Sequence, residues 1–287
     1  CTPIRAQDRK ATDIEWPLNS GQWLRPGPIA ESRLLGRWPS QATYNVWSDA
    51  AWTNAESLIL QEGDNPVQMG CDVARFGDDF TAIHVRRGPV SLHHESHNGW
   101  STVQTTGRLK ELCREWGQYA GVTPQTITVN VDDDGVGGGV VDQKDDYNFC
   151  PLSAANVAMD SEGYPNRRSE LWFSVAERAS ENQLSLYKLD AETKREMRRQ
   201  AMAPTWKLDS KGRRVVEPKD DTKKRIKRSP DDMDAMNLAR KDCRDTRLYK
   251  SIGEQCAGMA TGHSRGRTVY HSRAHITGSA GRVIPAA

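Results

Sequence analysis

Residues 67–88 read VQMGCDVARFGDDFTAIHVRRG, and this stretch decides the fold. Residues 67–74 and 80–88 are apolar stretches with strand-like patterning, and the segment between them is rich in Gly and Asp, which is typical of a turn. The pattern predicts two antiparallel strands. Asp72 lies on the first strand beside the small residues Gly70 and Ala74, which leave room for a metal ion and a phosphate to approach.

A second acidic stretch, TITVNVDDDGVGGGVVDQ at residues 126–143, follows a segment of helical spacing at residues 102–117. A strand, a helix and another strand in this order predict an α/β unit. Functional side chains in such sheets gather at the carboxyl ends of strands, so we expect Asp132 to meet Asp72 there. Asp133 and Asp134 are interpreted as caps of the helix that the glycines open.

The glycine-rich turn itself has two interpretations. Its order does not match GxGxxG, and no acidic residue follows a second strand as a dinucleotide site requires, so that alternative is the weaker one. Free backbone N–H groups at the start of a helix favour an anion, and a nucleic-acid phosphate is the ligand that we expect.

A third acidic motif, SPDDMDAMNLARKDC, spans residues 229–243 and predicts a helix with Pro230 at an early position. Asp231 and Asp234 are three residues apart and therefore share one helical face. Carboxylates that converge from distant parts of a chain repel one another unless divalent cations neutralise them. The sequence thus predicts a metal-dependent site built from Asp72, Asp132, Asp231 and Asp234.

Positive charge is concentrated just before that motif. The formal net charge is only +2, but residues 207–228 hold ten Lys and Arg against four Asp and Glu. Residues 205–219 predict a β-hairpin, and residues 166–182 and 191–202 predict helices. A solvated charged surface is the alternative to a DNA-phosphate contact. The candidate DNA-binding residues are Arg167, Arg168, Lys211, Arg213, Arg214, Lys223, Lys224, Arg225, Lys227 and Arg228.

Composition limits the remaining possibilities. The chain has 287 residues, 36% of them hydrophobic, enough for one main domain with added segments. Its six cysteines show no zinc spacing and predict a reduced intracellular protein, and no apolar run is long enough to span a membrane. His93, His94 and His97 are interpreted as surface residues because no acidic partner for a metal site is evident nearby.

Taken together, GCDVARFGDD, VDDDGVGGGVVD, NRRSELWFSVAER, EPKDDTKKR and SPDDMDAMNLA resemble, in this order, the nuclease half of tailed-bacteriophage terminase large subunits, over about residues 30–242. The resemblance implies an RNase H-like fold, a mixed central sheet flanked by helices with an added β-hairpin. It also implies an endonuclease that cuts concatemeric viral double-stranded DNA during packaging with two Mg²⁺ or Mn²⁺ ions. The family's metal-binding positions fall on Asp72, Asp132 and the Asp231/Asp234 pair, where Asp234 matches best.

The resemblance also implies a domain organisation and partners. Residues 1–60, rich in Trp and ending in a short helix near residues 49–61, resemble the segment that joins the family's ATPase to its nuclease. Residues 61–243 would form the nuclease domain, and residues 244–287 a flexible basic tail. No GxxxxGK[ST] motif occurs, so we expect no ATPase activity. Portal protein and small terminase subunit are the expected partners, in the cytoplasm of the infected host.

Two other functional classes remain open. Another RNase H-like enzyme, such as a junction resolvase or an integrase, would share the acidic cluster but prefer branched or transposon-end DNA. A non-catalytic DNA- or portal-binding module would carry the same acids only as caps and surface charges, and would take up no metal specifically.

Overall fold

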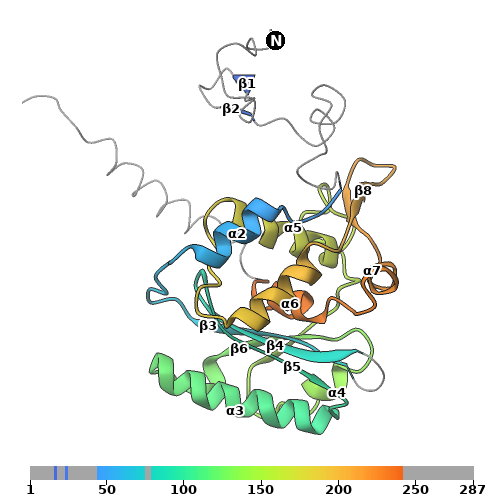
Figure 1. Cartoon of the computed structure of the whole chain (residues 1–287). Coiled ribbons are helices and arrows are strands. Elements are labelled where there is room, and N and C mark those ends of the chain that lie inside the picture. The colour runs from blue at the N-terminus through green and yellow to red at the C-terminus, as the bar shows by residue number, and fades with distance from the viewer. Residues whose placement is uncertain (1–15, 18–22, 25–43, 75–78, 242–287) are drawn as a thin grey trace, which may run out of the picture. The chain divides into compact units, whose positions relative to one another are not determined.

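The computed structural model describes residues 16–17, 23–24, 44–74 and 79–241 (Figure 1). All of them belong to one unit, Cys1–Arg244. The expected tail at residues 244–287 and most of the expected linker lie outside the described residues. Within residues 1–43, β1 (Trp16–Pro17) pairs with β2 (Trp23–Leu24) in an antiparallel ladder of its own.

A five-stranded mixed sheet with the order β5-β4-β3-β6-β7 forms the centre of residues 44–241. β3 (Val67–Asp72) pairs antiparallel with β4 (Phe80–Arg87), as residues 67–88 predict, and β4 pairs antiparallel with β5 (Val90–Asn98). On its other side β3 runs parallel to β6 (Thr128–Asp132), which is parallel to β7 (Phe149–Leu152). The parallel pairing brings the carboxyl ends of β3 and β6 to the same edge of the sheet.

Helices cover both faces of the sheet (Figure 1). On one face lies α3 (Thr102–Ala120), which begins with a capping box at Ser101 and ends at Gly121, whose φ of 69° suits glycine. The short 3-10 turn η1 (Pro124–Thr126) follows it, and α4 (Gly138–Val141) is a single turn. Leu109, Leu112 and Val140 bury their side chains there against the sheet.

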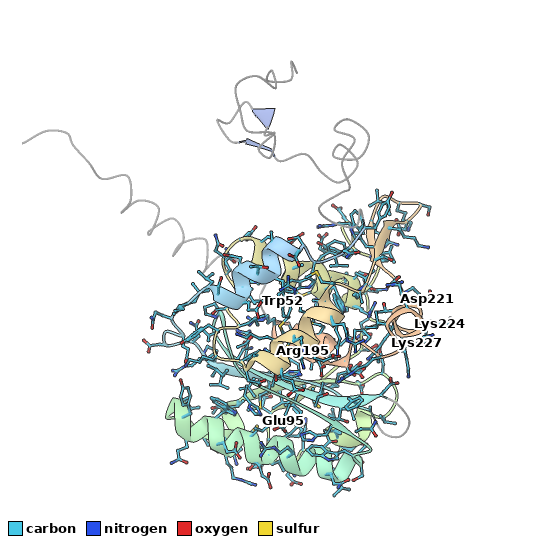
Figure 2. The ribbon with its side chains drawn as sticks, in the orientation of Figure 1. Trp52, Glu95, Arg195, Asp221, Lys224 and Lys227 are labelled. Carbon is cyan, nitrogen blue, oxygen red and sulfur yellow. The ribbon has the colours of Figure 1, made fainter. Side chains whose placement is uncertain are left out.

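The second face is covered by α2 (Asp49–Ser57), α5 (Arg167–Ser180), α6 (Ala191–Ala201) and α8 (Asp231–Ala239). Trp47, Trp52 and Trp172 are each at most 1% exposed in the core between these helices, and Trp52 is labelled in Figure 2. Trp47 and Trp52 meet edge to face, with ring centroids 5.5 Å apart. These helices confirm the sequence predictions near residues 49–61, 166–182, 191–202 and 229–243 to within a few residues.

An antiparallel hairpin is added to this core, as residues 205–219 predict. It consists of β8 (Trp206–Leu208) and β9 (Arg214–Val216), and it leads into α7 (Lys219–Ile226). The sequence does not predict α7, because this segment is a run of charged residues. Among the described residues, no helix has the length and apolar character that crossing a bilayer requires.

Close packing of α8 against the sheet depends on Gly70. A Cβ atom added there would lie 2.1 Å from the Ala235 carbonyl oxygen and 2.3 Å from the Ala239 nitrogen, both on the α8 backbone. Any side chain larger than hydrogen would therefore push α8 away from β3. β3 carries Asp72, and α8 carries Asp231 and Asp234. Gly70 therefore sets the distance between these acidic residues.

Candidate active site

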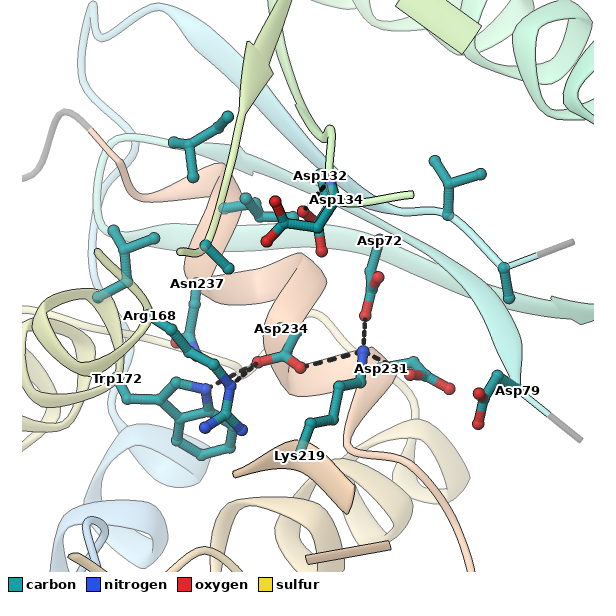
Figure 3. A pocket seen from close by; sticks show the side chains of 16 residues that line it. Asp72, Asp79, Asp132, Asp134, Arg168, Trp172, Lys219, Asp231, Asp234 and Asn237 are labelled. Carbon is teal, nitrogen blue, oxygen red and sulfur yellow. Dashed lines mark hydrogen bonds and ion pairs between the residues drawn. The ribbon is translucent and has the colours of Figure 1, made fainter. Parts of the chain in front are cut away.

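The four aspartates predicted from the sequence line one cavity of about 310 Å³ (Figure 3). Asp72 ends β3 and Asp132 ends the neighbouring parallel strand β6, so both side chains reach the same edge of the sheet. Asp231 and Asp234 lie in the first turn of α8, which packs on β3. The fold therefore brings these residues together from three distant segments.

Each of these carboxylates is held by neighbouring donors. The Phe80 backbone N–H donates to Asp231 Oδ2 at 3.0 Å, and the Asp134 backbone N–H donates to Asp132 Oδ1 at 3.1 Å. The indole N–H of Trp172 donates to Asp234 Oδ1 at 2.7 Å. These bonds fix one oxygen of Asp132, Asp231 and Asp234, and the second oxygens of Asp231 and Asp234 face Lys219.

Lys219, the first residue of α7, places its ammonium group among three of these aspartates (Figure 3). Its Nζ atom lies 2.7 Å from Asp72 Oδ2, 2.9 Å from Asp231 Oδ1 and 3.3 Å from Asp234 Oδ2. Sequence reasoning missed this residue, because nothing in the local pattern separates it from the other basic residues of 207–228. The ammonium group supplies positive charge where carboxylates would otherwise repel one another.

Burial and mutual repulsion change the acidities of this cluster. Burial raises the pKa of Asp72 well above its usual range, Lys219 opposes the rise, and the charges of Asp231 and Asp234 add to it. Burial also raises the pKa of Asp132 to about 6, against a hydrogen bond from the Asp134 backbone. The pKa of Lys219 is raised well above its usual value by the three aspartates, despite the opposing effect of burial. The site therefore favours either protons or added positive charge.

A divalent cation suits this donor set. Carboxylate oxygens are the ligands that Mg²⁺ and Mn²⁺ prefer. The raised pKa values of Asp72 and Asp132 come first from burial and then from the neighbouring carboxylates, and a bound cation would offset both effects. Among the residues described, no three His, Cys, Asp or Glu side chains form a ready-made metal site. The Lys219 ammonium group lies where the oxygens of Asp72, Asp231 and Asp234 converge. The aspartates therefore fit a divalent cation once the ammonium group of Lys219 moves away.

The basic residues predicted to bind DNA occupy several different environments. Arg168 lines the cavity, whereas Arg167 is 7% exposed and pairs with Glu170 at 2.7 Å, a geometry that does not favour contact with DNA. Lys211 and Lys227 are exposed and have no ion pair among the described residues. The others are paired with nearby acids: Arg213 with Asp209, Arg214 with Glu177, Lys223 with Asp79, Lys224 with Asp221, Arg225 with Glu217, and Arg228 with Glu196 and Asp232.

Two interpretations of individual side chains are wrong. The first is that Asp133 and Asp134 cap the glycine-rich helix. α4 has Gly137 as its N-cap and receives no capping bond from a side chain. The Asp134 carboxylate instead accepts hydrogen bonds from the Ser153 hydroxyl and the Ala155 backbone N–H. The second is that His94 is a surface residue without an acidic partner. Its side chain is 4% exposed, and its Nε2 atom lies 3.1 Å from Asp232 Oδ1, which is remote in sequence. His93 and His97 are about one-third exposed and pair with Glu95.

Comparisons with known proteins place this fold. No family profile and no curated protein sequence matches the chain. Among solved structures, the nuclease domain of the large terminase subunit gp2 of bacterial virus Sf6 matches with a TM-score of 0.56 and 12% identity, over 68% of this chain and 97% of that chain. A lysine-to-alanine mutant of that domain with manganese and beta-thujaplicinol gives 0.56 and 13%, over 68% and 97%.

The same mutant with calcium gives a TM-score of 0.56 at 13% identity, over 68% of this chain and 98% of that chain. At such identities the similarity establishes the fold. Residues 44–241 therefore have the RNase H-like fold of phage large-terminase nuclease domains, which confirms the fold expected from the motifs.

Proposed function

We propose that this protein is a divalent-metal-dependent endonuclease that cuts concatemeric double-stranded viral DNA during genome packaging. The observation that carries the proposal is the convergence of Asp72, Asp132, Asp231 and Asp234 in one cavity. The shared fold supports it, because the similar structures are nuclease domains, one of them with manganese.

Asp72, Asp132, Asp231 and Asp234 would hold two Mg²⁺ or Mn²⁺ ions, which supply an activated water and stabilise the leaving oxygen of a phosphodiester. The charges of the other three aspartates all act on Asp72, so it would hold the cations together with them. Lys219 neutralises the cluster in the metal-free protein, and its ammonium group has to leave when cations take its place.

The basic hairpin and α7 would hold the DNA backbone without reading bases, since their cations contact phosphates rather than base edges. Cleavage should then be weakly sequence-selective and sensitive to salt. In the infected cell, the portal protein and the small terminase subunit would be the partners, and the host cytoplasm the place of action.

The test is cleavage of linear duplex DNA in Mn²⁺ by the wild type and by Asp72→Asn. Loss of one ligand of the cluster should abolish cutting while DNA binding stays nearly intact. Asp133→Asn is the matched control, because Asp133 is exposed and does not line the cavity. Cutting by Asp72→Asn at the wild-type rate would refute the proposal.

Two further measurements separate the other functional classes. Calorimetry with Mn²⁺ should detect uptake by the wild type that is weakened in Asp72→Asn, whereas a non-catalytic module predicts no specific uptake. A preference for four-way junctions over linear duplex would instead favour a resolvase-like enzyme.

A further inference from the structure

The cavity extends beyond the carboxylates into an apolar end. Leu152, Leu171 and Leu238 form a small buried cluster there, and all three line the cavity. Two further polar side chains, Arg168 and Asn237, line the same cavity, with Arg168 beside Asp234. Neither forms a hydrogen bond with the carboxylate cluster, so these buried polar groups call for an explanation.

Arg168 offers one unused edge of its guanidinium group. Its Nη1 atom donates to the Glu217 carbonyl at 2.6 Å, which anchors the side chain. Nε and Nη2 are buried and have no hydrogen-bond partner among the described residues. Nε lies 3.9 Å from Asp234 Oδ1, which is too far for a hydrogen bond. Nε and Nη2 together form a fork that matches two oxygens of a phosphate.

Asn237 lies one turn after Asp234 on α8 and is 2% exposed. Neither its Oδ1 nor its Nδ2 atom has a hydrogen-bond partner within the described part of the chain. A buried amide with both polar atoms unpaired is costly, and the cost is retained most readily where a ligand uses the group.

Charge decides which ligand fits this end. Among the described residues that line the cavity, the cations are Lys219 and Arg168. Lys219 is engaged by three aspartates, whereas Arg168 stands beside the other oxygen of Asp234, with its guanidinium carbon 5.6 Å from the Trp172 ring centroid (Figure 3). A cationic ligand gains nothing from such a pair of donors, whereas an anionic oxygen group gains both the charge and the fork. The phosphate of a DNA strand is the anionic group that the proposed function supplies here.

We propose that the Nε/Nη2 edge of Arg168 and the Asn237 amide form a subsite for one phosphate group of the DNA strand, next to the carboxylate cluster. The inference rests on the proposed nuclease function and deepens it by assigning the phosphate to named groups. Arg168 binds two phosphate oxygens, and Asn237 Nδ2 donates to one of them, while Trp172 keeps Asp234 in place beside the bound strand.

Two variants test this subsite. Arg168→Lys keeps the charge and loses the fork, and cleavage in Mn²⁺ should fall about 10- to 100-fold. Asn237→Leu replaces the amide by an apolar group of similar shape, so cleavage should fall about 2- to 10-fold while the melting temperature stays equal or rises, because unpaired polar atoms are removed. Arg195→Lys is the matched control, since the Arg195 side chain is 79% exposed and lies outside this cavity.

Mn²⁺ uptake by calorimetry should be unchanged in both variants, which separates a contact to phosphate from a contact to the ions. The subsite is refuted if Asn237→Leu and Arg168→Lys cut like the wild type while Asp72→Asn is inactive; the unpaired atoms then bind water only. It is also refuted if Asn237→Leu loses stability and activity together, as a structural role predicts. A wild type that neither cuts DNA nor takes up Mn²⁺ refutes the proposed function itself.

Discussion

At the scale of single residues, Gly70 controls the site without contributing a functional group. Its missing side chain lets the backbone of α8 approach β3, with the Ala235 carbonyl oxygen 2.1 Å from where a Cβ would be. Because the obstacle is backbone, a larger residue cannot be accommodated by a change of rotamer. The whole helix would have to shift, and Asp231 and Asp234 would shift with it.

We therefore predict that Gly70→Ala lowers the free energy of unfolding by about 1–3 kcal/mol, the usual cost of overpacking. DNA cleavage should fall further than stability alone explains, since Asp72 and α8 move apart. Urea unfolding and a cleavage assay measure the two effects. Gly107→Ala is the control: nothing lies within 4 Å of its Cβ position in α3, so that variant should gain about 0.5–1 kcal/mol.

Residues also show where sequence reasoning succeeds and where it fails. Asp72 and Asp132 could be placed because each follows an apolar strand, and parallel strands bring such residues to one edge. Lys219 could not be placed from the sequence, since its role depends on the direction in which α7 leaves the hairpin. Asn237 was missed for a similar reason: an amide one turn after Asp234 has no local signature, and only burial without a partner makes it conspicuous.

At the scale of elements, the β8–β9 hairpin presents two exposed lysines. Lys207 and Lys211 lie on β8 and on its turn, both are exposed, and neither forms an ion pair within the described residues. Arg214 on β9 is instead tied to Glu177 and lies over the rings of Tyr164 and Phe173, so it supports the hairpin. Arg214 thus anchors the hairpin to the core, while Lys207 and Lys211 remain exposed on it.

We predict that replacing Lys207 and Lys211 together by Ala weakens DNA binding and lowers the slope of log K against log salt concentration by about 2, since each lost phosphate contact removes roughly one unit. Binding is measured in the Asp72→Asn background, where the DNA stays intact. The charge-matched control replaces Arg114 and Arg195, which are exposed on α3 and α6. An unchanged slope would place the DNA on another surface.

Elements differ in how well the sequence predicts them. The strands β3, β4 and β6 and the helices α3, α5 and α8 have clear periodicity or caps, and their predictions are confirmed. β7 has only four residues and contains Pro151, and α7 is a run of charges with one buried residue, Thr222. Such short or polar elements take their conformation from the neighbours that they contact, so no pattern along the chain reveals them.

At the scale of the whole molecule, the acidic cavity makes stability depend on pH and metal. The pKa of Asp132 is about 6 in the folded protein against a usual 3.8, so the folded state holds more protons between these values. The free energy of unfolding therefore falls as pH rises through this window. Asp72, whose pKa is also raised, adds to the fall. Glu95, Glu217 and Asp232 act in the opposite direction: their pKa values are lowered to about 2 from 4.5, 4.5 and 3.8, so their stabilising effect still grows as pH rises to about 5.

We predict that the metal-free protein loses up to about 3 kcal/mol from Asp132 between about pH 4 and pH 6, the equivalent of its pKa shift. Urea unfolding across this range measures the loss, and Asp132→Asn should show a shallower dependence. Mn²⁺ at saturating concentration should reverse the trend, because the cation replaces the protons and its affinity rises with pH. A pH dependence of stability that is the same in the wild type and in Asp132→Asn would contradict the raised pKa of Asp132.

The four aspartates lie on β3, β6 and α8, and the last of these is the final helix of the described fold. A ribosome delivers the chain from its amino terminus, so Asp72 and Asp132 emerge long before Asp231 and Asp234 are translated. A nascent polypeptide that ends before α8 carries only half of the cluster and lacks two of the three aspartates that contact Lys219. The cavity with all four aspartates therefore forms only after this last helix has been translated.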